Sequence, residues 1–445
     1  MVEKLALSNG IPGINVDLEF HYFVRNPWQW VFRKAWDEYL QVPTNSQVLE
    51  QTCRRNLPCT KIILGAGNAK PPTNKRLGPL RPCTLRVEVV QPIRMHSTGC
   101  NRVEYSLLYM AQGTSFALDC VSDKDDLVRT LQTCNCDYLA PPSLLIDWDV
   151  TEEFLKKEIR LPGLQVDLAQ VAVLKTPLGS GGDGVYFVSS IEEIAVLVKE
   201  NYNRAVKERG FLESIQLSLG RIPSWVLQAE VAPAMLIRGG RKFHLRSYVV
   251  IVETENTENK NIPSTETYIY NRHEVRTAFA PIIHTDEKRD RMAHITNGAQ
   301  GNDTRRSLLQ DEEDLIRTGL QEKLELFVAN AFHVDLSAAI VSSLLKGKQA
   351  TTTNVTYCDE MFPKTKVFTF AGVDIMVGAD EKLYLLEVNV NPAAPPMHVL
   401  DDRFVDHLTG LGADLLELVI DQNICEGRKR SNFILASDIL ARRNP

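Results

Sequence analysis

The stretch GVDIMVGADEKLYLLEVNVNP, residues 372–392, decides the fold of the part of the chain around it. Two apolar runs flank a short polar segment, which is the pattern of two buried antiparallel strands joined by a turn. We expect strands at 367–377 and 383–390, with residues 379–382 as the hairpin loop. This reading fixes which side chains meet across the ladder.

Polar side chains on the hairpin predict a metal site. If Gly378 faces Leu383, then Asp374 lies directly opposite Glu387. Because successive strand residues point to opposite faces, Asn389 shares the face of Glu387. Two carboxylates among apolar neighbours repel each other unless a cation lies between them. Carboxylate and amide oxygens suit Mg²⁺; the alternative is an ordinary hairpin whose acids are solvated.

A glycine-rich segment lies between two further apolar runs in VAVLKTPLGSGGDGVYFV, residues 171–188. The first run ends at Lys175, and glycines at 179–184 would let backbone N–H groups approach phosphate oxygens closely. No GK[ST] follows, no helix follows, and the chain has no HRD or DFG, which argues against a Walker A loop, a dinucleotide fingerprint and a protein kinase. The pattern indicates either a flap over a triphosphate or a plain hairpin turn.

Cations alternate along a third segment, GGRKFHLRSYVVIV, residues 239–252. Alternation places Lys242, His244 and Arg246 on one face of a strand. Two fixed cations on one face suit a phosphate or a carboxylate, although a solvated face gives the same pattern. A further arginine, Arg276, lies in YNRHEVRTA.

Composition excludes several classes of protein. The chain has 445 residues, of which 44% are hydrophobic and 24% charged, and its net charge of -6 argues against a general nucleic-acid binder. Nine cysteines form no CxxC pair and the histidines form no HExxH, so we expect reduced thiols and no zinc site. No signal peptide and no apolar run of about 18 residues is recognisable. We therefore expect a cytosolic protein with neither a nucleic-acid nor a membrane partner.

The remaining pattern is mixed α/β. Residues 1–100 read as an N-terminal α/β region of uncertain role. Helices are expected at 191–208, 311–331 and 403–422, between the short strands that follow residue 171.

Seven segments resemble the tubulin–tyrosine ligase family, a branch of the ATP-grasp enzymes, in the family's order. They are KTPLGSGGDGV, VLQAEV, GGRKFHLRSYV, YNRHEVRTA, HITN, GVDIMV and LLEVNVNPA. The resemblance implies an α/β (α+β) ATP-grasp fold with N-terminal, central and C-terminal subdomains, whose antiparallel sheets sandwich ATP. It assigns 100–425 to the ligase region, with a central part at about 145–230 and an ATP/Mg part at about 231–425, and leaves 426–445 as a tail.

The resemblance also implies roles for individual residues. Asp374, Glu387 and Asn389 would hold Mg²⁺. Arg246 and Arg276 would face the γ-phosphate, the acyl intermediate and the carboxylate of the incoming amino acid. The residues implied to bind ATP are Lys175, Gly182, Asp183, Gly184, Gln228, Ala229, Glu230, Val231, Lys242, His244, Thr296 and Asn297.

The implied reaction joins a protein carboxylate to the amine of a free amino acid through an acyl phosphate, at the expense of ATP. One position departs from the family, which usually has Asp where this chain has His244. A histidine cannot accept hydrogen bonds as a carboxylate does, so nucleotide contacts could differ or activity could be lost.

Three hypotheses follow. The first is a tyrosine ligase acting on tubulin C-terminal tails, favoured by Asp183, where many glutamylating relatives carry Arg, and by the lack of a long basic extension after residue 425. The second is a ligase of the same mechanism that adds glutamate or glycine to tubulin or another protein. The third is a nucleotide-binding or tubulin-binding scaffold without turnover.

Overall fold

A computed structural model of the chain describes the residues on which the fold and site rest. They are 2–6, 15–21, 30–31, 34–35, 60–61, 84–86, 117–148, 153, 155, 172–176, 184–207, 223–237, 239–254, 263–282, 291–296, 305–352, 368–390, 392, 394–395, 397–421 and 432–442.

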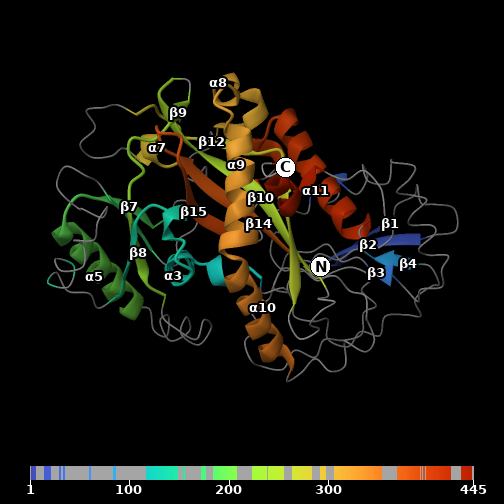
Figure 1. The fold of residues 1–445 in the computed structure, drawn as a ribbon, viewed down its shortest axis with the longest axis horizontal. Coiled ribbons are helices and arrows are strands. Elements are labelled where there is room, and N and C mark those ends of the chain that lie inside the picture. The colour runs from blue at the N-terminus through green and yellow to red at the C-terminus, as the bar shows by residue number, and fades with distance from the viewer. Residues whose placement is uncertain are drawn as a thin grey trace.

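An eight-stranded antiparallel sheet forms the centre of the molecule (Figure 1). Its longest strand, β10, pairs with β12 and then β11 along one edge and with β14 along the other, so both hydrogen-bonding edges of β10 are paired. The strands are β9 (Leu236–Ile237), β10 (Arg241–Thr254), β11 (Ser264–Tyr270), β12 (Glu274–Thr277), β13 (Arg305–Leu308), β14 (Phe368–Val377), β15 (Leu383–Val390) and β16 (Phe433–Leu435).

The hairpin of β14 and β15 confirms the expected pairing of Asp374 with Glu387. The expected position of the turn was wrong, however, because Leu383 faces Val377 rather than Gly378. A β-bulge immediately after Asp374 adds one unpaired residue to β15 and restores the register. The two carboxylates therefore form the pair next to the bulge, in the same register as the pairs that follow on the side away from the turn.

One face of this sheet packs on a bent helical segment. This segment consists of α9 (Leu320–Ala329), a π-helical segment (Asn330–Asp335) and α10 (Ser337–Thr352), with a bend of 52° before α10. Phe243 and Leu245 of β10 belong to the core that the sheet and this segment share, as their alternation with Lys242 and His244 predicts. Each fully buried Leu or Phe side chain contributes roughly 1.5–3 kcal/mol to stability, so this contact is a main part of the core.

The single helix expected at 311–331 is instead two helices. A short α8 (Glu313–Ile316) ends before Gly319, whose φ of 67° is left-handed, and α9 begins at Leu320. A residue in that conformation ends a helix, because its backbone turns away from the helical path.

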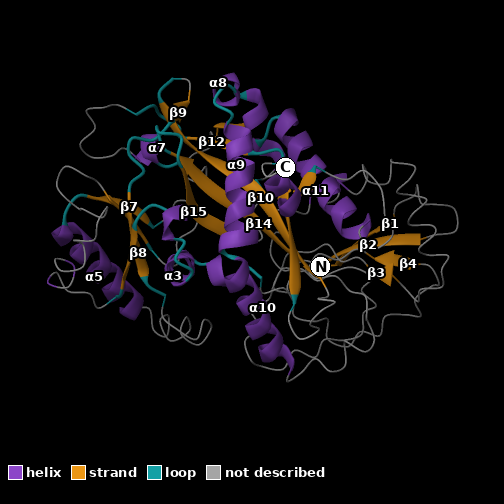
Figure 2. Cartoon of the chain, viewed as in Figure 1, coloured by secondary structure: helices purple, strands orange, loops and turns teal. Residues whose placement is uncertain are grey.

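A second, four-stranded antiparallel sheet carries the glycine-rich hairpin. Its order is β5-β8-β6-β7, and its strands are β5 (Ser143–Ile146), β6 (Ala172–Lys175), β7 (Val185–Val188) and β8 (Trp225–Ala229). Trp225 is fully buried, with its ring centroid 5.5 Å from that of Trp148. Helix α5 (Ile191–Lys207) confirms the expected helix, and α3 (Lys124–Thr133) lies between this sheet and β15 (Figure 2).

Helix α11 (Asp402–Asp421) confirms the third expected helix. A separate mixed sheet in the N-terminal region has the order β1-β2-β4-β3, with β1 (Val2–Ala6), β2 (Asn15–His21), β3 (Thr60–Lys61) and β4 (Thr84–Arg86). The short helices are α7 (Arg291–His294) and α12 (Ala436–Ala441), with 3₁₀ segments at Asp119–Val121, Asp137–Leu139, Leu309–Asp311 and Met397–Val399.

Among the helices described, none by itself is long and apolar enough to cross a membrane. The bent pair Leu320–Asp335 and Ser337–Lys346 passes such a test together, by length and composition alone.

Candidate functional site

A cavity lies between the two antiparallel sheets, and most of the expected nucleotide-binding residues line it. On its apolar walls are Val173, Val185 and Phe187 from the smaller sheet, facing Met376 and Leu386 from the larger one. Such walls can hold a flat ring between them. The expected residues that line the cavity are Lys175, Gln228, Ala229, Glu230, Val231, Lys242, His244, Thr296, Asp374 and Glu387.

Side chains on β8 and after it hold two lysines toward the cavity. Gln228 Oε1 accepts a hydrogen bond from Lys175 Nζ at 2.7 Å, and Glu230 Oε1 accepts one from Lys242 Nζ at 3.1 Å. His294 Nδ1 also lies 3.3 Å from Glu230. The two ammonium groups come from different sheets, so a chain of phosphates between the sheets could contact both.

The protonation of Lys175 leads to a prediction. Burial lowers the pKa of Lys175 to about 8, although the nearby Glu387 carboxylate opposes this shift. A bound phosphate would raise this pKa again, so binding would take up a proton above pH 8. We expect affinity for an ATP analogue to fall as pH rises through 8, by up to about tenfold per pH unit.

Calorimetry at pH 7, 8 and 9 measures this slope. Lys175→Arg keeps its charge over that range, so it should flatten the curve. An equally steep fall in Lys175→Arg would show that another group is responsible.

Gly184 closes the glycine-rich hairpin in a conformation that other residues rarely adopt. Its φ is 72°, and its carbonyl accepts a 2.8 Å hydrogen bond from the Thr176 amide. A β-carbon at this position would overlap the Thr176 side chain. Glycine is therefore required here both by backbone conformation and by the neighbouring side chain.

Gly184→Ala should therefore destabilise the protein by more than the roughly 1–2 kcal/mol that a left-handed alanine costs. Gly239→Ala is a matched control, because Gly239 also has a positive φ, 85°, but nothing lies within 4 Å of its added β-carbon. Urea unfolding of both variants separates the two contributions. Equal losses would mean that Thr176 imposes no constraint.

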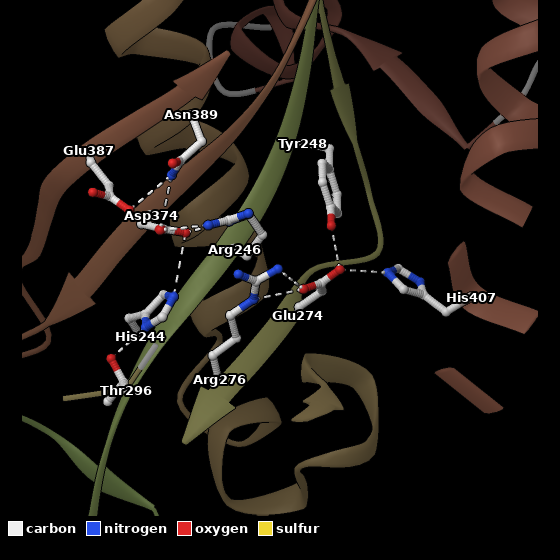
Figure 3. Close-up of polar contacts among 10 residues, drawn as sticks. All are labelled: His244, Arg246, Tyr248, Glu274, Arg276, Thr296, Asp374, Glu387, Asn389 and His407. Carbon is white, nitrogen blue, oxygen red and sulfur yellow. Dashed lines mark hydrogen bonds and ion pairs between the residues drawn. The ribbon is translucent and has the colours of Figure 1, made fainter. Parts of the chain in front are cut away.

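Asp374 is the centre of a buried charge cluster (Figure 3). Arg246 donates to both of its carboxylate oxygens, at 2.7 Å from Nη2 to Oδ2 and through Nε to Oδ1. His244 Nε2 lies 3.4 Å from Oδ1, and its Nδ1 lies 2.5 Å from Thr296 Oγ1. Burial alone would raise the pKa of Asp374, but the charge of Arg246 holds it well below its usual range. Arg246 of the neighbouring strand thus supplies part of the positive charge that the two hairpin carboxylates were expected to need.

The three expected Mg²⁺ ligands lie together. Asn389 Nδ2 is 3.2 Å from Asp374 Oδ2 and 3.0 Å from Glu387 Oε1. The assigned amide orientation presents nitrogen, and a half-turn would present the oxygen instead. Two carboxylates and one amide oxygen fit Mg²⁺, which takes few protein ligands and completes its shell with water and phosphate oxygens. No group of three or more His, Cys, Asp or Glu side chains arranged for a metal is present among the residues described.

Arg276 lies next to this cluster but is held by a different carboxylate. Glu274 Oε2 accepts hydrogen bonds from Arg276 Nε at 2.9 Å and Nη2 at 2.7 Å. Tyr248 Oη donates to Glu274 Oε1 at 2.5 Å, and His407 Nε2 of α11 lies 3.5 Å from the same atom. Burial would raise the pKa of Glu274, but Arg276 and His407 keep it well below its usual range.

The remaining expected residues Gly182, Asp183 and Asn297 lie outside the residues described. Sequence reasoning missed the Glu274 network and the apolar walls of the cavity. Alternation could have placed Glu274 on the face of Arg276, because the two are separated by one residue in a strand. His407 is far away in sequence and gave no such signal.

The sequence matches the model of a family described as the tubulin-tyrosine ligase family over residues 124–423, which is more than half of the chain. Among solved structures, the chain is similar to the C-terminal domain from K. lactis Pby1, described as an ATP-grasp enzyme interacting with the mRNA decapping enzyme Dcp2. That likeness covers 95% of this chain and 98% of the other, with 15% identity and a TM-score of 0.49. The family match includes both walls of the cavity.

Proposed function

The chain belongs to the tubulin-tyrosine ligase family and is by that membership an ATP-dependent ligase of the ATP-grasp type, and we propose that it joins a free amino acid to a protein carboxylate. The family match and the two facing antiparallel sheets together confirm the expected fold class. The observation that best supports the proposal is the cavity between the sheets, where the expected phosphate-binding lysines and metal-binding carboxylates converge. These residues are Lys175, Lys242, Asp374 and Glu387.

The first step would be attack of an acceptor carboxylate oxygen on the γ-phosphorus of ATP, with ADP as the leaving group. Lys175 and Lys242 would hold the phosphates from opposite walls, and the apolar walls would hold the adenine ring. Asp374, Glu387 and Asn389 would hold Mg²⁺, which neutralises phosphate charge when it is bound. Arg246, fixed by Asp374, would stabilise the charge that develops on the transferring group.

In the second step, the amine of a free amino acid would attack the acyl carbon, inorganic phosphate would leave, and the amine would lose a proton. Arg276, fixed in direction by Glu274, would orient the carboxylate of the incoming amino acid. These roles need positioned cations and no nucleophilic serine or cysteine.

The proposed acceptor is the C-terminal tail of tubulin, and the proposed donor is tyrosine, in the cytoplasm near the cytoskeleton. The alternatives are glutamate or glycine as donor, or another protein as acceptor. A scaffold without turnover also stays open because of His244. Its ring is engaged by Thr296 and Asp374 in the cavity, where the family usually has an aspartate.

The test is incorporation of radiolabelled tyrosine, glutamate and glycine into detyrosinated tubulin with Mg-ATP. Incorporation of one amino acid, lost in Glu387→Gln, would support a ligase and identify its donor. If none is incorporated, binding of an ATP analogue distinguishes another acceptor from a site closed by His244. If the unmodified protein neither incorporates an amino acid nor binds the ATP analogue, the proposed function is refuted.

A further inference from the structure

Arg306 of β13 lies beside Arg276 in the large sheet. The two are direct cross-strand partners, and Arg276 is in turn the partner of His244. Directly opposed like charges destabilise a sheet, because their side chains start about 5 Å apart. Two neighbouring arginines therefore need anions close by.

The other two arginines of this face are hydrogen-bonded to such anions, but Arg306 is not. The Glu274 carboxylate is close enough to interact with its charge, but both Glu274 oxygens accept hydrogen bonds from Tyr248 and Arg276 instead. Asp374 binds Arg246 and Glu274 binds Arg276, each through two hydrogen bonds. Within the described part of the chain, Nε and Nη1 of Arg306 are buried without a hydrogen-bond partner, and no carboxylate forms an ion pair with it.

The surroundings of Arg306 favour a bound anion. The guanidinium carbon of Arg306 lies over the Phe404 ring of α11, 5.8 Å from the ring centroid. The ring face attracts the cation, but it does not accept the hydrogen bonds that the guanidinium donates in its own plane. Burial and the neighbouring charge of Arg276 lower the pKa of Arg306 to about 10, although the Glu274 carboxylate opposes this shift. A cation whose Nε and Nη1 are buried without an acceptor is stabilised by an anion that accepts these planar N–H groups.

We propose that Arg306, together with Arg276, binds a carboxylate group of a substrate, on the assumption that the proposed ligase function holds. A carboxylate matches the planar fork of a guanidinium through two parallel hydrogen bonds. The phosphates of ATP are expected at Lys175 and Lys242. Arg306 is on the second strand beyond β10, about 10 Å across the sheet from His244.

A carboxylate could come from either substrate, the free amino acid or the acidic acceptor. We would measure dissociation constants by calorimetry, with a non-hydrolysable ATP analogue bound. One arm compares free tyrosine, glutamate and glycine with their α-carboxamides, and the other compares a hexaglutamate with a hexaglutamine peptide. Arg306→Gln is the test variant. Arg317→Gln is the control, because the Arg317 side chain is exposed and forms a surface ion pair with Glu313.

Arg306→Gln should weaken binding of the carboxylate probe in one arm by about tenfold or more, with no change for its amide counterpart. The arm that responds identifies the source of the carboxylate. Arg317→Gln should bind both probes as the unmodified protein does. If Arg306→Gln fails to fold, as judged by circular dichroism, Arg306→Lys replaces it, because lysine keeps the charge but loses the bidentate geometry.

Equal affinities of the unmodified protein and both Arg306 variants for every carboxylate probe would overturn the inference. Competition at Arg306 by inorganic phosphate alone would also overturn the assignment of a carboxylate. If the unmodified protein binds the ATP analogue but neither probe, the site is refuted while nucleotide binding stands. If it does not bind the analogue, the proposed function itself fails.

Discussion

Glu387→Gln is expected to reduce Mg-ATP turnover on the order of a hundredfold or more, the usual effect of losing one charge-stabilising group in an active site. The fold should remain, because glutamine has the same shape and its side-chain oxygen can still accept the 3.0 Å hydrogen bond from Asn389. The loss should therefore be in turnover rather than in stability. Amino-acid incorporation and thermal unfolding, measured on the same preparation, separate the two.

Glu381→Gln is the matched control for this experiment. Glu381 lies in the turn of the same hairpin and pairs with Lys323 on the surface, away from the cavity. It makes the same chemical change without touching the expected metal ligands. Turnover in Glu387→Gln equal to that in Glu381→Gln would remove Glu387 from the catalytic site.

Glu274→Ala is expected to destabilise the protein by about 3–5 kcal/mol, the typical result of removing one partner of a buried ion pair. Glu274 is fully buried, and the substitution leaves the Arg276 guanidinium and the Tyr248 hydroxyl without their acceptor. Urea unfolding measures the loss. A cost below about 1 kcal/mol, as found for exposed ion pairs, would contradict the expectation.

Glu325→Ala provides a comparison, because Glu325 is a partly buried carboxylate close to the start of β12. Glu325 of α9 lies 3.8 Å from His273, the neighbour of Glu274, but it binds no arginine of the site. It is also less buried, so a smaller loss is expected.

The same network is expected to make the stability of the protein depend on pH in the acid range. The pKa of Glu274 is lowered in the folded protein, so its contribution to stability is complete above the ordinary carboxyl pKa of about 4.3. It is lost as pH falls from there through the lower folded value. In Glu274→Ala, stability should fall less steeply below about pH 4.

Local sequence patterns predicted much of the fold and of the site. Alternation placed Lys242, His244 and Arg246 on one face of β10, and all three are buried there. The hairpin pattern predicted that Asp374 meets Glu387, and the structure confirms it. Both features depend only on residues that are close together in the chain, where a period of two is decisive.

Contacts between distant segments could not be predicted in this way. Arg246 and Asp374 are 128 residues apart, and their pairing exists because β14 adds to the edge of β10. The pairing of Glu274 with His407 likewise depends on where α11 packs. In contrast, the break before α9 had a local signal in Gly319, which the prediction of one unbroken helix at 311–331 did not take into account.

The bulge after Asp374 divides the hairpin into two segments whose registers are set separately. A one-residue slip in a regular ladder would send every side chain to the opposite face. Here the bulge absorbs the difference, so the side of the ladder next to the turn can gain or lose a residue while Asp374 still faces Glu387. The hairpin can therefore vary in length between related chains, or accept an engineered insertion in the turn, without separating its two carboxylates.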